Sequence, residues 1–271
     1  MARVLRWLLG GTAIYAALCL LAFLLQRRLL YFPERYSEER ARLIAKSLGL
    51  RPWVDSRGAT VGWQALPPGP PQARVLVLHG NAGSALDRDY YAAAFNLLNV
   101  EVILLEYPGY GMRAGSPSLA ALGDAAAEAL DDLAARGKEP IWVLGESLGS
   151  GVAARAVALR PGIARGLVLV TPFARMADLV RKHFPFLPSA LLRDRFAPAT
   201  DLAGYRGPAA VIIAGRDEVV GAEQGQRLFE ALIGPKLLFL QEEATHNGLN
   251  LNSRAPFWRE IVDFLTSNGR G

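Results

Sequence analysis

The chain has 271 residues, enough for one medium-sized domain and a short additional segment. Hydrophobic residues make up 51% of it and charged residues 20%, so a large core can be buried. The formal net charge is +5, but the basic residues are scattered and are not interleaved with aromatic side chains, so we expect no nucleic-acid partner. The one cysteine, Cys19, excludes a disulfide within the chain and leaves the redox compartment open.

The first predicted element is an apolar helix. No charged residue lies between Trp7 and Leu25, and Leu5 extends the apolar run past Arg6. A helix of about 20 residues spans roughly 30 Å, the thickness of the hydrocarbon core of a bilayer. We therefore expect residues 5–25 to lie in the membrane as an uncleaved single-pass anchor.

Two alternatives fit this run less well. A cleaved signal peptide would have a shorter apolar region and a small-x-small cleavage site, whereas this run ends in Leu24-Leu25-Gln26-Arg27-Arg28. A buried core helix would rarely be apolar on all sides and then stop at an arginine pair. More arginines follow the run than precede it, which slightly favours a cytoplasmic location for the rest of the chain.

The chain after the anchor divides into two parts. We predict an anchor with its flank over residues 1–30, a linker with an amphipathic helix (Ser37 to Leu48) over 31–60, and the main domain over 61–271. Short apolar runs alternate with helical stretches throughout the main domain. The predicted strands are 74–78, 100–105, 141–144, 167–170, 211–214 and 237–240. One predicted helix ends near residue 98, and the others span 118–136, 148–159 and 256–265.

These strands predict a mostly parallel sheet. Apart from Arg74 and Glu101, these runs are apolar and show no polar alternation, which is typical of strands covered by helices on both faces. The fold class is therefore α/β, and no internal repeat is present at a fixed period.

A candidate nucleophile follows the strand 141–144. Gly145-Glu146-Ser147-Leu148-Gly149 lies between that strand and a helix rich in small residues, which is the strand–turn–helix context that the G-x-S-x-G pattern needs. Gly145 and Gly149 permit a sharp turn that raises the Ser147 hydroxyl above the carboxyl edge of the sheet. The N–H of Leu148, at a helix N-terminus, then points to where an oxyanion would form. A chance match is the alternative, because such patterns are common in glycine-rich chains.

A second oxyanion donor is expected in an earlier loop. The strand 74–78 runs into His79-Gly80-Asn81-Ala82-Gly83. Gly80 permits a tight backbone, and the N–H of Asn81 is the predicted donor. His79 is predicted to hold this loop in shape by hydrogen bonding and to take no part in catalysis.

The order serine, acid, histidine along the chain selects the remaining candidates. His246 follows the last strand, whereas His183 precedes the strand that should carry the acid. Asp217 lies just after the strand 211–214 and is preferred to its neighbour Glu218 by its distance from the strand end. We therefore predict a catalytic triad of Ser147, Asp217 and His246.

At this point the sequence resembles the single-pass α/β-hydrolases known as lysophospholipase-like or serine-aminopeptidase-like hydrolases. The resemblance covers about residues 30 to 264 and, besides the two loops above, includes the motifs 107–111, 115–118, 171–173 and 185–188. It implies an α/β-hydrolase fold and activity as an esterase, thioesterase or lipase. Two residues depart from the family pattern: Arg113 stands in place of a serine and Glu106 in place of an aspartate.

The segment 172–200 is too long for a simple turn and is rich in apolar residues broken by prolines. It predicts either a short cap that favours an apolar acyl chain or residues that pack against the sheet edge. With the anchor, a cap favours a membrane-bound serine hydrolase that cleaves carboxylic esters or thioesters of small-molecule or lipid-like acyl substrates.

Two other functions remain open. One is a serine exopeptidase or amidase with the same triad, in which Glu106 or Glu218 would hold the amino terminus of the substrate. The other is a non-catalytic interaction module tethered to the membrane. No metal ion or cofactor is predicted, because no His/Asp/Glu cluster has ligand spacing and no dinucleotide fingerprint is present. The sequence leaves the oligomeric state open.

Overall fold

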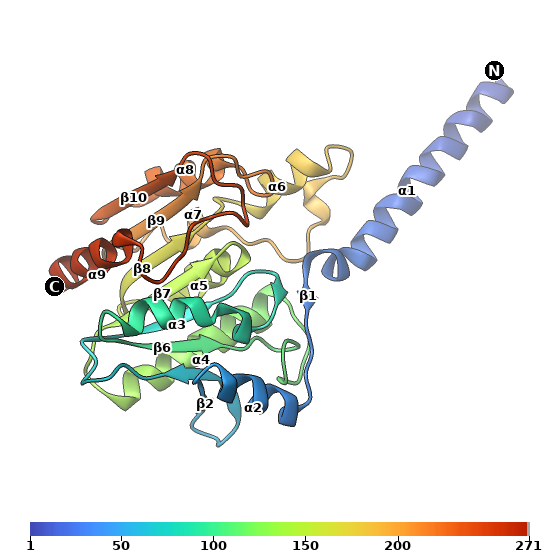
Figure 1. Cartoon of the computed structure of the whole chain (residues 1–271). Coiled ribbons are helices and arrows are strands. Elements are labelled where there is room, and N and C mark those ends of the chain that lie inside the picture. Colours follow the sequence, from blue (N-terminus) through green and yellow to red (C-terminus); the bar gives the residue numbers. More distant parts are fainter. Residues whose placement is uncertain (270–271) are drawn as a thin grey trace.

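The predicted apolar runs form one eight-stranded sheet in the computed structural model, which describes residues 1–269 (Figure 1). The strand order is β10-β9-β8-β7-β4-β6-β3-β2. The pairs from β10 to β6 are parallel, and β3 and β2 are added antiparallel at one edge. The strands are β2 (Arg51–Val54), β3 (Thr60–Ala65), β4 (Ala73–Leu78), β6 (Val100–Leu105), β7 (Ile141–Glu146), β8 (Ala164–Val170), β9 (Ala209–Ala214) and β10 (Lys236–Gln241).

Two apolar layers cover the sheet, one on each face. Successive side chains of a strand point to opposite faces, so Leu76 belongs to one buried cluster and its neighbours Val75 and Val77 to the other. The first cluster includes residues of α4 (Leu119–Arg136), α5 (Leu148–Leu159) and α8 (Ala222–Ala231), together with Met176 at the start of α6 (Met176–His183). Those that contribute to the second are α2 (Glu38–Ser47), α3 (Asp89–Asn96) and α9 (Pro256–Asn268), with the short helix η1 (Ala85–Arg88). Burial on both faces explains why the central strands are uniformly apolar.

Local signals in the sequence account for the ends of several helices. The side chain of Ser37 accepts a hydrogen bond from the N–H of Arg40 at the start of α2, and Ser118 does the same for Ala121 at the start of α4. Such caps satisfy backbone donors that the helix leaves free. Helix α4 ends at Gly137, and α9 begins with Pro256, a residue suited to the first helical turn.

The parallel core was predicted correctly and its edge was not. Six predicted strands correspond to β4, β6, β7, β8, β9 and β10, which confirms the α/β-hydrolase fold class. Strands β2 and β3 were not predicted, and β2 lies within the range 31–60 expected to hold a linker and the amphipathic helix. The sheet therefore begins at Arg51, ahead of the expected domain start at residue 61. Helix α8 was also not predicted.

The N-terminal helix α1 (Ala2–Leu30) projects from the domain and has no buried residue (Figure 1). Its most apolar stretch has a mean hydropathy of 2.3. Within residues 1–269 it is the one helix long and apolar enough to cross a membrane, by length and composition. It is therefore a candidate transmembrane helix.

The segment between β8 and β9 is part buried and part exposed, and the prediction that it caps the site stays a prediction. It contains α6 (Met176–His183), the short helix η2 (Ser189–Leu191) and α7 (Pro198–Asp201). Phe173 and Phe196 are buried in the core, as expected of residues that pack against the sheet. Phe184 and Phe186, at the outer end of the segment, are exposed.

Candidate active site

Ser147 occupies a strained turn between β7 and α5. Its backbone angles are φ 51° and ψ −116°, which a residue with a Cβ rarely adopts. Strain of this kind costs of order 1–3 kcal/mol and persists only where the surroundings enforce it. The Ser147 N–H donates to the carbonyl of Val170 on β8 at 2.8 Å, which ties the turn to the neighbouring strand.

The flanking glycines allow this turn to pack against the sheet. A Cβ on Gly145 would lie 2.5 Å from the carbonyl oxygen of Gly149 and 2.7 Å from the Cα of Ser150. A Cβ on Gly149 would lie 2.6 Å from the carbonyl oxygen of His79, and closer still to that of Leu78 at the end of β4. These neighbours are backbone atoms, which cannot rotate away. Both positions therefore require glycine for steric reasons.

Three side chains predicted from separate parts of the sequence meet above the sheet. The Ser147 Oγ lies 3.0 Å from His246 Nε2, and His246 Nδ1 lies 2.8 Å from Asp217 Oδ2. Asp217 follows β9 and His246 follows β10, so both reach the carboxyl edge where Ser147 stands. His183 is not part of this group, because its Nε2 donates to the carbonyl of Val219.

Hydrogen bonds keep the acid in its ionised form. Burial by itself would raise the pKa of Asp217, but hydrogen bonds from His246 and from the N–H of Val220 outweigh it and hold the pKa below its ordinary value. The Asp217 Oδ1 accepts from the N–H groups of Val219 and Val220 at 2.9 and 2.7 Å. Glu218 points its carboxylate to the backbone instead and accepts the N–H of His246 at 3.2 Å.

The loop predicted to supply an oxyanion donor lies beside this group. Gly80 lies next to the nucleophile turn, since a Cβ there would come within 3.4 Å of Glu146 Oε1. Within residues 1–269, the N–H groups of Asn81 and Leu148 have no side-chain or loop acceptor. Both are thus free to donate to a ligand, as an oxyanion hole requires.

The chain just after α1 braces that loop. Strand β1 (Phe32–Pro33) pairs with β5 (Ala82–Gly83), and the Phe32 N–H donates to the carbonyl of Asn81 at 2.9 Å. The Asn81 side-chain amide donates to the carbonyl of Leu30 at 3.0 Å, and Tyr110 Oη donates to the Asn81 carbonyl at 2.7 Å. The sequence carried no signal for this contact, because Leu30 and Phe32 are far from Asn81 along the chain.

His79 lies beneath the loop and is 1% exposed. Its Nδ1 donates to the carbonyl of Gly80 at 2.8 Å, and its ring lies 4.0 Å from that of Tyr107. Burial lowers the pKa of His79 to about 3, so the ring is neutral at ordinary pH. The contacts of His79 thus fit the predicted part in shaping the loop.

Glu106 is a second buried group beneath the loop and is 2% exposed. Its Oε1 accepts the N–H of Ala85 at 3.1 Å and lies 3.8 Å from His79 Nε2. Burial raises the pKa of Glu106 to about 7, although the hydrogen bond from Ala85 opposes the shift.

A partly buried ion pair next to Ser147 was not predicted. Arg88 contacts both carboxylate oxygens of Glu146, and Glu146 Oε2 also accepts hydrogen bonds from the hydroxyls of Tyr90 and Tyr91 at 2.6 and 2.9 Å. A cleft beside His246 is lined by Arg88, Tyr90 and Glu146 among others. No pattern in the sequence links Arg88 to Glu146, because the two residues belong to different structural units.

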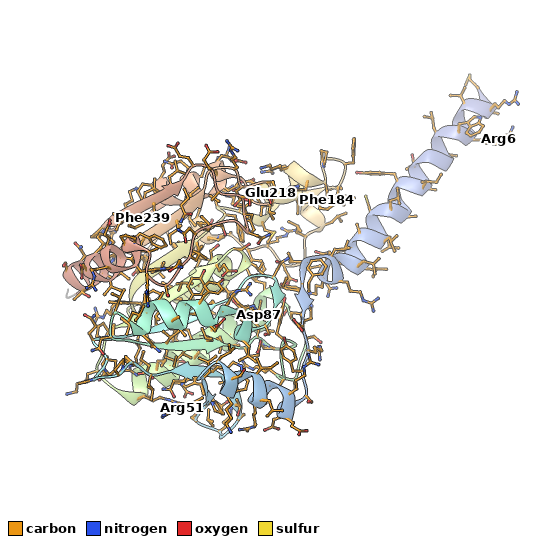
Figure 2. The ribbon with its side chains drawn as sticks, viewed as in Figure 1. Arg6, Arg51, Asp87, Phe184, Glu218 and Phe239 are labelled. Atoms are coloured by element: carbon orange, nitrogen blue, oxygen red, sulfur yellow. The ribbon has the colours of Figure 1, made fainter. Side chains whose placement is uncertain are left out.

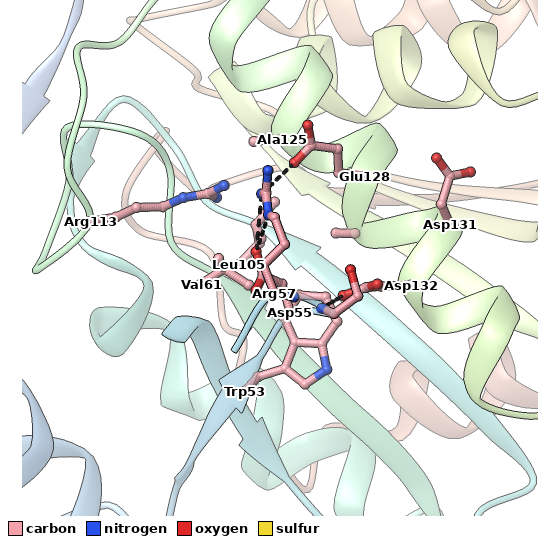
Figure 3. A pocket seen from close by; sticks show the side chains of 12 residues that line it. Trp53, Asp55, Arg57, Val61, Leu105, Arg113, Ala125, Glu128, Asp131 and Asp132 are labelled. Carbon is pink, nitrogen blue, oxygen red and sulfur yellow. Dashed lines mark hydrogen bonds and ion pairs between the residues drawn. The ribbon is translucent and has the colours of Figure 1, made fainter. Parts of the chain in front are cut away.

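Arg113, one of the two departures from the family pattern, lies at a different cavity (Figure 3). This cavity has a volume of about 260 Å³ and lies between the sheet edge that carries Trp53 and helix α4. Arg57 crosses it to contact Asp55 and Glu128. The described lining includes none of the three residues that meet at Ser147.

Comparisons with known proteins agree with the fold. An esterase of Pyrococcus furiosus superposes with a TM-score of 0.64 at 19% identity, over 88% of this chain and 98% of the esterase. A monoacylglycerol lipase of Paleococcus ferrophilus superposes with a TM-score of 0.58 at 18% identity, over 76% of this chain and 98% of the lipase. The class of protein that the fold defines is the α/β-hydrolase.

Sequence comparison identifies the family. Residues 69–204 match the Hydrolase_4 family, described as serine aminopeptidase, S33. An uncharacterised protein of Mycobacterium tuberculosis is 34% identical over 248 residues, which are 89% of this chain and 87% of the relative. The chain belongs to this α/β-hydrolase family, and the expected resemblance is confirmed. The matched range includes Ser147 and ends before Asp217 and His246.

More distant relatives have assigned names. The protein bem46 of Schizosaccharomyces pombe is 29% identical over 73% of this chain and 69% of its own length. The lysophosphatidylserine lipase ABHD12 of Gallus gallus is 32% identical over 49% of this chain and 36% of its own length.

The glycine contacts generate a first prediction. The substitution Gly149→Ala should lower the midpoint of thermal unfolding, because the new methyl group overlaps the backbone of β4. In the control Gly162→Ala, a Cβ would meet no atom within 4 Å, and only a small loss of stability from the positive φ of Gly162 is expected. Circular dichroism during heating measures both midpoints. A Gly149→Ala midpoint equal to or above that of Gly162→Ala would contradict the close packing described above.

Glu106 generates a second prediction. Because the pKa of Glu106 is raised, its carboxyl group holds a proton more tightly in the folded protein than in the unfolded chain between about pH 4.5 and 7. The stability of the folded protein therefore falls as the pH rises through that window. The substitution Glu106→Gln removes this ionisation. The free energy of unfolding of the variant minus that of the wild type should therefore be larger at pH 8 than at pH 4.5, by about 3 kcal/mol. Urea unfolding of detergent-solubilised protein at both pH values measures the gain, and equal pH dependence of the two proteins would contradict the assignment.

Proposed function

We propose that the protein is a membrane-anchored serine hydrolase that cleaves carboxylic ester or thioester bonds of apolar, lipid-like acyl substrates. The observation that carries the proposal is the hydrogen-bonded series from Ser147 through His246 to Asp217, with separations of 3.0 and 2.8 Å. An ordered nucleophile, base and orienting acid is the arrangement that acyl transfer requires. The names of the esterase and lipase neighbours and of the ABHD12 relatives support an ester substrate.

The proposed reaction has two halves. In the first, Ser147 Oγ attacks the acyl carbonyl carbon while His246 Nε2 accepts the hydroxyl proton and passes it to the leaving oxygen or sulfur. In the second, His246 activates a water molecule that releases the acyl group from Ser147. Asp217 accepts the Nδ1 proton in a hydrogen bond, which selects the tautomer with a free Nε2 lone pair and stabilises the charged ring.

The N–H groups of Asn81 and Leu148 are the proposed oxyanion hole. Each donor in such a site lowers the barrier by about 3 kcal/mol, because the negative charge of the tetrahedral intermediate meets fixed dipoles. Gly80, Gly145 and Gly149 are proposed to hold these donors close to Ser147, and His79 to hold the shape of the first loop.

Membrane attachment is proposed to occur through residues 5–25 of α1. The support is the length and hydropathy of the helix, together with the lack of any buried residue in it. Contacts of its C-terminal end with the catalytic domain, such as that of Leu30 with Asn81, also favour a helix that remains attached. The proposed cytoplasmic location of the domain rests on the arginines after the helix.

The triad generates a prediction for the nucleophile and the acid. A fluorophosphonate probe should label the wild type and fail to label Ser147→Ala, whereas the exposed-residue control Ser267→Ala should label normally. Asp217→Asn should lower kcat for an ester substrate by about ten-thousand-fold, because the amide favours the wrong His246 tautomer. Labelling of Ser147→Ala at the wild-type rate would refute the assignment of the nucleophile.

A serine exopeptidase is the second candidate, favoured by the family description as a serine aminopeptidase. The two carboxylates considered for binding a substrate amine are poorly placed for it. Glu106 is 2% exposed, and one oxygen of Glu218 accepts the N–H of His246.

Parallel assays of matched ester and amide substrates separate the two candidates. The ester of a medium-length fatty acid should be cleaved, and an aminoacyl anilide with a free amino terminus should not. Faster cleavage of the anilide by the wild type, lost in Ser147→Ala, would establish the exopeptidase instead. Absence of both activities in the wild type would leave the interaction module as the better description.

A further inference from the structure

The outer end of the segment between β8 and β9 carries an exposed apolar tip, which we define as Phe184–Pro188. Its five residues, Phe-Pro-Phe-Leu-Pro, carry no charge, and the side chains of Phe184 and Phe186 are 54% and 83% exposed. Adjacent exposed phenylalanines are costly in water and commonly mark a surface that contacts a lipid or a protein.

This tip lies along the candidate membrane helix. The hydroxyl of Tyr15, midway along α1, donates to the carbonyl of Phe186 at 2.9 Å. The guanidinium of Arg193 lies 5.6 Å from the centre of the Phe23 ring. Figure 2 shows Phe184 on the side of the domain from which α1 projects. The tip is therefore continuous with the apolar surface of the helix.

Polar contacts hold the two elements together at the base of the helix. Arg27 donates two hydrogen bonds to Asp194, at 2.8 and 3.0 Å, and the Asp194 side chain is 4% exposed. Asp194 also accepts the N–H of Leu119 at the start of α4 at 3.0 Å. Gln26 accepts the N–H of Arg193 at 2.7 Å and donates to the carbonyl of Leu191 at 3.2 Å. These hydrogen bonds fix the position of the segment that carries the tip along the helix.

Helix geometry gives the level of the tip. Tyr15 precedes Arg27 by twelve residues, which at 1.5 Å per residue places it about 18 Å along the axis. If Arg27 and Arg28 mark the boundary of the hydrocarbon, whose thickness is about 30 Å, an upright helix places Tyr15 near the bilayer midplane. A tilted helix reduces this depth but keeps Phe186 on the apolar side of the boundary.

The charges around the tip fit a lipid surface. Arg193 and Arg195 follow it and Arg28 lies at the C-terminal end of α1, whereas Lys182, which precedes it, is paired with Glu223. Long basic side chains at the edge of an apolar insertion place their charges among lipid phosphates while their stems remain in apolar surroundings.

We propose that the tip Phe184–Pro188 inserts into the same leaflet as the C-terminal half of α1 and forms a second membrane contact. This inference rests on the membrane anchoring proposed above. Two attachments fix the rotation of the domain about the helix, which one helix alone leaves free.

The second attachment also reaches the catalytic acid. His183, directly before the tip, donates to the carbonyl of Val219 at 2.6 Å, and the Val219 N–H donates to Asp217. Insertion of the tip into the bilayer would therefore also restrain the loop that carries Asp217.

The first test measures how deeply position 186 lies in the bilayer. In full-length protein with Cys19→Ser, a bimane label is placed at Phe186→Cys and, as a control, at Leu97→Cys, a 61% exposed apolar position on the domain. Each variant is reconstituted into vesicles with lipids brominated along their acyl chains. We expect bromine to quench the label at position 186 and leave that at 97 unchanged, and aqueous iodide to do the reverse. Quenching of position 186 by iodide would overturn the proposal, as would shielding from both quenchers, which would indicate a protein contact.

The second test measures function. The double variant Phe184→Ser with Phe186→Ser should hydrolyse a monoacyl ester in vesicles about tenfold more slowly than the wild type. The reason is that the loss of two inserted rings weakens the attachment of the tip to the membrane. Hydrolysis of a short water-soluble ester by the same samples should stay within about twofold. The control is Leu97→Ser with Leu240→Ser, two exposed positions away from the tip.

The outcomes separate the two proposals. Equal rates of the tip variant and the wild type on the vesicle ester would overturn membrane insertion of the tip. If the wild type hydrolyses neither ester, the proposed function fails, and the depth measurement still decides where the tip lies.

Discussion

The backbone of Gly149 lies against the carbonyl groups of Leu78 and His79, where a hydrogen atom fits and a methyl group does not. This contact lets the first turn of α5 sit directly on the end of β4. The nucleophile turn and the Asn81 loop are thereby held together, although they come from different parts of the chain. The unfavourable backbone angles of Ser147 persist because this packing leaves the turn no room to relax. The placement of the other site residues depends on that arrangement.

The two sides of the site are held by elements that also contact the N-terminal helix. On one side, Phe32 and Leu30 hydrogen-bond to Asn81 and brace the loop with the proposed oxyanion donor. On the other side, α6 contacts the loop that carries Asp217 through His183, and the following residues contact α1 through Asp194. The base of the helix is thus part of the catalytic domain as well as a tether. A chain cut after residue 30 would lose the contact of Leu30 with the Asn81 loop and that of Arg27 with Asp194.

The regular core of the fold was predictable because its signals are local. A fully buried parallel strand is apolar along its whole length, so β4, β6, β7, β8 and β9 were visible as short apolar runs. The edge strands β2 and β3 were missed, because each mixes polar and apolar residues in a short stretch that has no clear period. The cluster of Arg88 with Glu146 was also missed, since an ion pair between distant residues leaves no pattern in sequence spacing.

The sequence by itself determined the class of chemistry that the chain can support: a serine flanked by glycines after a buried strand, followed along the chain by an aspartate and a histidine at later strand ends. Parallel strands bring such positions to one edge, so their order was enough to group them. Only the tertiary structure decided that Ser147, His246 and Asp217 are within hydrogen-bonding distance, and that the chain after α1 pairs with the Asn81 loop. Those contacts join residues that are far apart in sequence, and they depend on the packing of whole layers, which no local pattern encodes.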